Sequence, residues 1–212
     1  NRIGDLSIYD GEMWHGISAG STNAQCGKYP LDYVSCAAAK DKKGHFFAAS
    51  YGGGVFEYEN YKAIKNYNPD NSTLKSENAK APDKYTRTEG AMVDDEGNLW
   101  VLNTGDEAFP INIMTPQKQW AGLNLYNAAN RQKVSFVTPW EIIVDKRDSQ
   151  YKWFVDQRGV MVYLLHDGGT PTNSADDYCY GRREFYDQDG LQIAPSAIYC
   201  MAQDNDGDMW IG

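Results

Sequence analysis

The sequence has few of the features that mark a membrane span, a metal site or a nucleic-acid surface. No apolar run approaches the roughly 18 residues that a spanning helix needs. Three histidines and four cysteines, with no Cys-x-x-Cys pair and no zinc-type spacing, predict no bound metal and no other cofactor. The net charge of −9 and the pI of about 4.8 disfavour nucleic acid as a partner, because an acidic protein repels phosphates.

The cysteines are too few and too scattered to define a disulfide framework. Cys36 and Cys200 stand in strand-like sequence, where we expect buried thiols, whereas Cys26 and Cys179 stand in loop-like sequence. A disulfide is compatible with an oxidising compartment. The sequence leaves the pairing of all four open.

Aromatic residues and glycine are abundant instead. The chain contains 15 Tyr, 6 Trp and 20 Gly, a mixture that favours many short strands separated by tight turns. Its 212 residues suffice for one all-β domain with a core of its own but are marginal for two domains. Helix-dominated folds are therefore disfavoured.

Four segments of the chain share one pattern. Each has a short apolar strand, an acidic turn and a second strand that carries a large aromatic residue, at Phe47, Trp100, Trp153 or Trp210. These aromatics are 53, 53 and 57 residues apart, which is a nearly constant repeat period. The third copy has two extra residues and no glycine after Asp145, so we expect its hairpin to be longer.

Further strand-like runs bring each repeat to four strands, which is typical of a β-propeller blade. The sequence predicts an all-β propeller of about three complete blades, with partial blades at both ends. The predicted units are a partial blade at 1–33, blades at 34–83, 84–136 and 137–195, and a partial blade at 196–212. Either the partial blades close into a four-bladed ring or the chain is an arc of a larger propeller, and the arc is favoured.

The repeats also resemble a known family. The segment 204–212, Asp-Asn-Asp-Gly-Asp-Met-Trp-Ile-Gly, and its echo at 94–101 resemble the two-component regulator propeller repeat of bacterial envelope proteins. The stretches 67–74, 166–171 and 189–200 are similar to PorZ-type propeller proteins of type IX secretion. The resemblance implies a protein without catalytic residues, located in the periplasm or at the outer-membrane cell surface.

Two functions follow from that resemblance. The first is a non-catalytic recognition or assembly module of the cell envelope that binds a glycan, lipopolysaccharide or an envelope protein. The alternative is a periplasmic ligand-sensing domain of a hybrid two-component system that detects oligosaccharides. A propeller hydrolase or lyase is a weaker third class, because it would need convergent acids or a metal site and the aligned repeats supply neither.

The binding face is predicted from what differs between the repeats. The hairpin turns are similar in every copy, whereas the loops between the second and third strands, at 51–54, 103–109 and 156–158, differ in length and chemistry. Such loops accept change without disturbing the packing of blades. The candidate ligand-binding residues on these loops are Tyr51, Asn103, Asp156 and Arg158.

Other polar clusters are weaker candidates. The acidic group Asp167, Asp176 and Asp177 lies in a long loop and is a candidate for a cation or ligand. The series at 204–208 imitates the start of a calcium loop, but its glycine stands fourth rather than sixth, so we expect a simple turn. None of the three histidines has a partner at an informative spacing.

Overall fold

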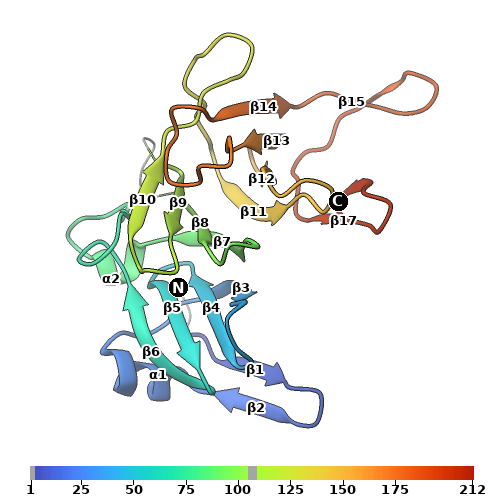
Figure 1. Cartoon of the computed structure of the whole chain (residues 1–212). Helices are drawn as coiled ribbons and strands as arrows, with labels where there is room; N and C mark the ends of the chain where they lie inside the picture. Colours follow the sequence, from blue (N-terminus) through green and yellow to red (C-terminus); the bar gives the residue numbers. More distant parts are fainter. Residues whose placement is uncertain (1–2, 105–108) are drawn as a thin grey trace.

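The computed structural model describes residues 3–104 and 109–212, and almost all of its regular structure is β (Figure 1). Within these residues there are three four-stranded antiparallel sheets, each with its strands in chain order. This is the all-β, four-stranded blade architecture that the sequence predicts. None of the helices in the described residues is long and apolar enough to cross a membrane.

The first sheet shows how the repeat is built. Its strands are β3 (Tyr33–Ala38), β4 (His45–Ser50), β5 (Gly54–Glu59) and β6 (Lys62–Tyr67). Gly54 has a φ of 77°, and a Cβ there would lie 2.2 Å from a backbone oxygen of β6. The turn from β4 to β5 therefore requires glycine both for its backbone angle and for the close approach of the next strand.

The second and third sheets repeat this order. The second consists of β7 (Thr88–Val93), β8 (Leu99–Asn103), β9 (Ile111–Met114) and β10 (Trp120–Leu123). The third consists of β11 (Pro139–Val144), β12 (Tyr151–Asp156), β13 (Met161–His166) and β14 (Tyr178–Arg182). Strand β7 packs beside both β3 and β11, so the first strand of each sheet lies on the inside of the arc (Figure 1).

Short hairpins and helices complete the chain. The two-stranded sheets pair β1 (Leu6–Tyr9) with β2 (Trp14–Ile17), β15 (Phe185–Tyr186) with β16 (Gln192–Ile193), and β17 (Met201–Gln203) with β18 (Met209–Ile211). The helices are α1 (Ala19–Cys26) and α2 (Pro82–Tyr85). In the described residues β1–β2 and β17–β18 are separate sheets, so the pairing that would close a four-bladed ring is not formed there.

The closing aromatics occupy equivalent positions, as predicted. Each stands opposite the same position of the first strand, in the pairs Ala37–Phe47, Met92–Trp100, Ile143–Trp153 and Ala202–Trp210. Trp100 is fully buried against the third sheet, whereas Trp210 on the last hairpin is 65% exposed. The closing aromatic therefore packs between two blades wherever the structure describes a blade after it.

A hydrogen bond links each tryptophan to its acidic turn. The indole Nε1 donates to a carboxylate Oδ2 in the pairs Trp100–Asp94 (2.8 Å), Trp153–Asp145 (2.7 Å) and Trp210–Asp204 (2.9 Å). In the first sheet the strand register places Ala39 at the acidic position, and the aromatic there is Phe47, which has no N–H to donate. Acid and tryptophan are thus present together or absent together, as expected of one structural unit.

The cysteine expectations were wrong in part. All four cysteines are free, and Cys36 and Cys200 are exposed rather than buried. Both line a cavity at the inner strands, where a strand residue can face open space. Cys179, assigned to a loop from the sequence, is buried in β14, while Cys26 ends α1.

Candidate functional site

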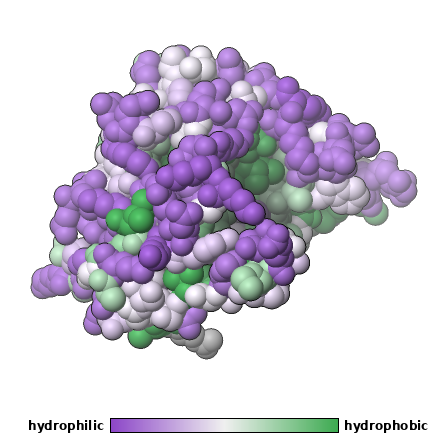
Figure 2. Space-filling model, turned by 60° about the horizontal axis from the view of Figure 1, so that its bottom comes forward, coloured by the Kyte–Doolittle hydropathy of each residue, from purple (hydrophilic) through white to green (hydrophobic). Residues whose placement is uncertain are grey.

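A cavity of about 470 Å³, here called the mouth cavity, is lined by the loops between second and third strands together with the first strands and the connections that lead into them. Tyr51 from the first sheet and Arg158 from the third both line it, although they are far apart in the sequence. Arg87, Glu77 and Trp140 contribute further walls. Its volume lies within the roughly 300–1,000 Å³ typical of small-molecule sites. Figure 2 shows one face of the molecule, largely hydrophilic, with apolar side chains visible inside a hollow.

Arg87 holds Tyr51 in place. Its guanidinium carbon lies 4.6 Å from the centre of the Tyr51 ring, and its NH1 donates a 3.1 Å hydrogen bond to the Tyr51 hydroxyl. Arg87 also pairs with Glu77, with 2.8 Å between NH1 and Oε2. Arg158 is exposed and lines the same cavity. The mouth thus combines an oriented aromatic ring with an available cation, groups that suit sugar stacking and anion pairing.

Asn103 and Asp156 are placed differently from Tyr51 and Arg158. Both are buried, and the strand register makes them equivalent to each other and to Ser50, at the end of the second strand of each sheet. Asp156 accepts hydrogen bonds from the backbone N–H groups of Val137 and Thr138, at 2.7 Å each. Asn103 and Asp156 therefore lie beneath the loops rather than on their surface.

Asn103 fixes the loop that carries Arg87. Its side-chain amide donates to the Arg87 carbonyl at 2.6 Å and accepts from the Lys75 N–H at 2.7 Å. Asn103 and Asp156 are therefore positioning residues for the loops above them. The rest of the loop predicted at 103–109 lies partly outside the described residues, which omit 105–108.

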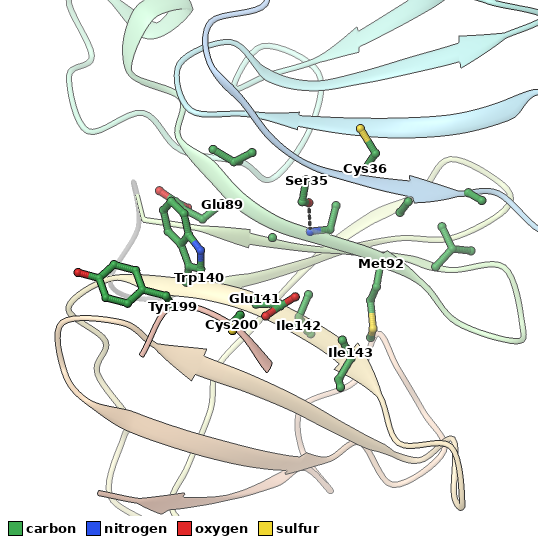
Figure 3. A pocket seen from close by; sticks show the side chains of 16 residues that line it. Ser35, Cys36, Glu89, Met92, Trp140, Glu141, Ile142, Ile143, Tyr199 and Cys200 are labelled. Atoms are coloured by element: carbon green, nitrogen blue, oxygen red, sulfur yellow. Dashed lines mark hydrogen bonds between the residues drawn. The ribbon is translucent and has the colours of Figure 1, made fainter. Parts of the chain in front are cut away.

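A second cavity, of about 400 Å³, lies between the inner strands and is here called the inner-strand cavity (Figure 3). One position of the repeat, at or just before the start of each first strand, contributes a residue to its lining from every copy. These residues are Val34, Glu89, Trp140 and Tyr199. We call these residues the inner ring. Val34 and Trp140 line the mouth cavity as well, so the two cavities are neighbours that share walls.

Glu89 is the one carboxyl group of the inner ring. The residue is 1% exposed, its Oε1 lies 3.0 Å from the Thr104 hydroxyl, and its Oε2 has no hydrogen-bond partner among the residues that the structure describes. Burial, together with the charge of Glu77, raises the pKa of Glu89 to about 8. Glu89 is therefore mostly a neutral carboxylic acid at pH 7, with one oxygen bonded and one unpaired.

This raised pKa predicts how stability depends on pH. Because the folded protein holds the Glu89 proton more tightly than the unfolded chain, Glu89 lowers the stability as pH rises from about 4.5 to about 8. Glu89→Gln removes the ionisable group and is expected to raise the free energy of unfolding at pH 7 by about 3 kcal/mol. At pH 4 the variant and the wild type should be nearly equal. Urea unfolding at both pH values measures this, and equal stabilities at pH 7 would refute the protonated state of Glu89.

The sequence did not single out Arg87, Glu89 or Trp140. Differences between the loops pointed to Tyr51 and Arg158, whereas Glu89 and Trp140 stand in the first strands, whose repeated pattern indicates packing. A signal was present, because the equivalent positions 34, 89, 140 and 199 hold Val, Glu, Trp and Tyr. Residues of different chemistry at one position of a repeat mark a place where the fold common to the blades does not dictate the side chain.

The acidic loop of the third sheet forms no metal-ligand group. Asp167 pairs with Lys152, and Asp176 accepts a hydrogen bond from Thr170 at 2.8 Å. Asp177 is buried, and within the described part of the chain neither of its carboxyl oxygens has a hydrogen-bond partner. Burial together with the charges of the nearby Asp167 and Asp176 raises the pKa of Asp177 to about 7. Across residues 3–104 and 109–212, no three His, Cys, Asp or Glu side chains are arranged to hold a metal ion.

Comparison with known proteins supports the repeat and the fold. The family model described as "Two component regulator propeller" matches residues 192–212, the part that contains the last hairpin. Sequence comparison with curated proteins finds no match.

The structure of PorZ from Porphyromonas gingivalis, described as an essential bacterial surface component of the type-IX secretion system, has the same fold. It superposes with a TM-score of 0.82 at 24% sequence identity and covers 100% of this chain. The chain spans 28% of the length of that PorZ chain.

Two further structures share the propeller fold at lower similarity. The extracellular domain of BT4673 from B. thetaiotaomicron, described as a hybrid two component system, has a TM-score of 0.54 at 15% identity and covers 85% of this chain and 22% of that one. A streptogramin B lyase has a TM-score of 0.52 at 14% identity and covers 86% of this chain and 48% of that one. The fold is therefore shared by a surface component, an extracellular domain of a two component system and a lyase, so the fold alone does not define a function.

Proposed function

We propose that this chain is a non-catalytic recognition module of the bacterial cell envelope, in the periplasm or at the outer-membrane surface, and that it binds a glycan or lipopolysaccharide at the mouth cavity. The observation that carries the proposal is the meeting of Tyr51, Arg87, Trp140 and Arg158, from three different sheets, around one cavity. The envelope location is supported by the likeness to PorZ, described as a surface component.

The chemistry of the mouth cavity suits a saccharide with an anionic substituent. Trp140 and the face of Tyr51 that Arg87 does not cover offer aromatic surface against which a sugar ring packs. Arg158 is exposed and has a fork of N–H donors that matches carboxylate or phosphate. The overall charge of −9 disfavours nonspecific capture of anions, so binding of an anionic glycan depends on these local groups.

The proposal predicts a clear difference between the two faces of the module. Tyr51→Ala and Arg158→Ala should each weaken the binding of lipopolysaccharide from Porphyromonas gingivalis, or of an oligosaccharide released from it, by about tenfold, since each removes a stacking or charge-assisted contact. Isothermal titration of the purified wild type and variants measures the affinities.

Matched controls lie on the hairpin turns, at Lys43→Ala and Glu96→Gln. Both residues are exposed and outside the mouth cavity, so their replacement should leave binding unchanged. Weaker binding in the turn variants with wild-type affinity in Tyr51→Ala and Arg158→Ala would assign recognition to the opposite face. If an envelope protein binds, no glycan binds, and Tyr51→Ala abolishes binding of the protein, then the partner is a protein and not a glycan.

A sensory role is the second candidate. It is favoured by the likeness to the extracellular domain of BT4673, described as a hybrid two component system. The same mouth cavity would then bind an oligosaccharide that drives signalling. The full-length sequence distinguishes the two roles, because a sensor requires a membrane-spanning helix and a kinase beyond the propeller.

A further inference from the structure

The closing aromatic of one blade packs into the next blade at one set of positions. The set consists of two alternate residues of the next first strand and the second-strand residue opposite the later of them. Each closing aromatic shares a core cluster or a ring contact with residues at these positions. The receiving residues are Ala91, Val93 and Leu99 for Phe47, Ile142, Val144 and Lys152 for Trp100, and Met201 and Met209 for Trp153.

The same positions of the first sheet are open. They hold Cys36, Ala38 and Phe46, which line a groove of about 560 Å³, here called the β1 groove, whose other wall is strand β1. Cys36 and Ala38 are exposed, whereas the equivalent Ile142 of the third sheet is buried beneath the second sheet. Because Cys36 and Ala38 are also small, the β1 groove has room for a large aromatic ring.

Hairpin β1–β2 lies against the first sheet as the third and fourth strands of a blade do. Leu6 and Ile8 of β1 pack against a cluster that contains Ala48. In the same way Val55, on the third strand of the first sheet, shares a cluster with Val101, which is equivalent to Ala48 in the second sheet. Among the described residues β1 pairs with β2 alone, so the β1 groove stands where the first and second strands of a blade would lie.

The last hairpin carries the group that fits this groove. Strands β17 and β18 take the positions of first and second strands, and their closing aromatic, Trp210, is 65% exposed. Its Nε1 already donates to Asp204 at 2.9 Å, so burial of the ring would leave no indole N–H unpaired. Hairpins β1–β2 and β17–β18 lie at opposite ends of the arc, so one copy presents the groove and Trp210 at different ends (Figure 1).

We propose that the β1 groove binds the β17–β18 hairpin of a second copy of this chain, with Trp210 inserted against Cys36, Ala38 and Phe46. The order β17–β18–β1–β2 then repeats the order of first to fourth strands in the three complete sheets. The occupant is a second copy because the chain itself contains both halves of the contact, an exposed closing tryptophan and an empty receiving groove. The two halves differ, so the contact is head-to-tail and continues into a ring or a filament.

This docking also covers a second exposed aromatic pair. Tyr9 and Trp14 are cross-strand partners on the face of β1–β2 opposite to Leu6, and they are 55% and 70% exposed. In the completed blade that face meets the third sheet of the first copy. The same row of the third sheet that begins with Trp153 ends at Tyr180, which is 53% exposed. Both aromatic surfaces become buried together.

Sedimentation velocity of the purified chain over a range of concentrations tests the proposal. The wild type should self-associate. Trp210→Ala, which removes the inserted ring, and Ala38→Glu, which places a charge in the groove, should each weaken self-association by about tenfold or more. Ile64→Ser is the matched control, because Ile64 is an exposed apolar residue of β6 outside both surfaces. Its self-association should equal that of the wild type.

A mixture of the two weakened variants distinguishes this contact from any other. Trp210→Ala keeps an intact groove and Ala38→Glu keeps an intact hairpin, so the mixture should form a one-to-one dimer and nothing larger. Circular dichroism establishes that both variants are folded. A monomeric wild type overturns the inference and leaves the groove to a blade of a longer chain. Unchanged self-association in Trp210→Ala and Ala38→Glu, or a mixture that forms no dimer, overturns it as well.

Discussion

Replacing Trp100 by alanine is expected to lower the free energy of unfolding by about 3–5 kcal/mol, as for other large aromatic residues removed from a core. Trp100 is fully buried in the cluster between the second and third sheets, with Phe154 and Tyr163 among its members. Alanine would leave a cavity there and would also leave Asp94 without its indole donor. Urea denaturation followed by circular dichroism measures the change.

Trp100→Phe is the matched control. It keeps most of the ring but has no N–H for Asp94, so it should cost clearly less than alanine, with the lost hydrogen bond contributing about 1 kcal/mol. Trp210→Ala should have a small effect on the isolated chain, because Trp210 is 65% exposed. A loss in Trp100→Ala no larger than in Trp210→Ala would contradict the packing of blades through this position.

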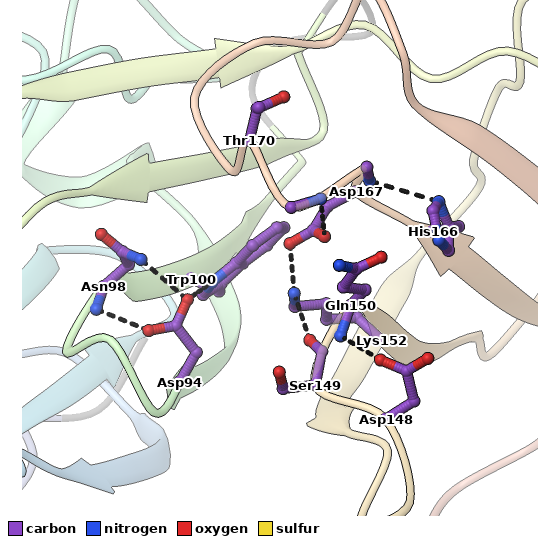
Figure 4. A network of polar contacts seen from close by, with 12 residues as sticks. Asp94, Asn98, Trp100, Asp148, Ser149, Gln150, Lys152, His166, Asp167 and Thr170 are labelled. Atoms are coloured by element: carbon purple, nitrogen blue, oxygen red, sulfur yellow. Dashed lines mark hydrogen bonds and ion pairs between the residues drawn. The ribbon is translucent and has the colours of Figure 1, made fainter.

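Removing Asp167 should be comparably destabilising. Lys152 is 2% exposed and makes an ion pair with Asp167, donates to the Ser149 carbonyl at 2.6 Å and lies 4.6 Å from the centre of the Trp100 ring (Figure 4). Asp167→Ala leaves the ammonium group buried without its counter-charge, which typically costs about 3–5 kcal/mol. Thermal and urea unfolding of the variant measure the loss.

The double variant Lys152→Met with Asp167→Leu separates charge from packing. Because it buries no unpaired charge, it should recover most of the stability lost in Asp167→Ala. If the double variant is as unstable as Asp167→Ala, the loss of stability comes from the lost hydrogen bonds of this network and not from burial of an unpaired charge. The pair fixes the third sheet against Trp100 of the second, so its loss should loosen one inter-blade contact.

The fold was predictable because the repeat is strong in the sequence. The period of Phe47, Trp100, Trp153 and Trp210, together with the acidic turn before each of them, predicts the hairpins, their register and the four-stranded sheets. Helix α1 was not predicted, because it has no apolar periodicity. It is set by its ends, where the Ser18 side chain accepts from the Ser21 N–H and Gly27 adopts a φ of 70°. The blade boundaries proposed at 34–83, 84–136 and 137–195 stay predictions.

The candidate site was predictable only in part. Loop divergence pointed to Tyr51 and Arg158, which line one cavity, but it could not show that Asn103 and Asp156 lie beneath the surface. Their burial depends on which face of the second strand each side chain takes, and this follows from the strand register rather than from loop composition. The protonated state of Glu89 depends on Thr104 and Glu77, which only the folded chain brings together.

Hydrogen exchange of the chain with and without bound lipopolysaccharide tests the central claim most directly. The account predicts slower exchange on binding in the loops around the mouth cavity, at 51–54, 137–140 and 157–158, because the ligand covers their backbone and restricts their opening. The hairpin turns at 41–44, 95–98 and 205–208 should exchange at unchanged rates. Protection confined to these turns, with none around Tyr51 and Arg158, would contradict recognition at the mouth cavity.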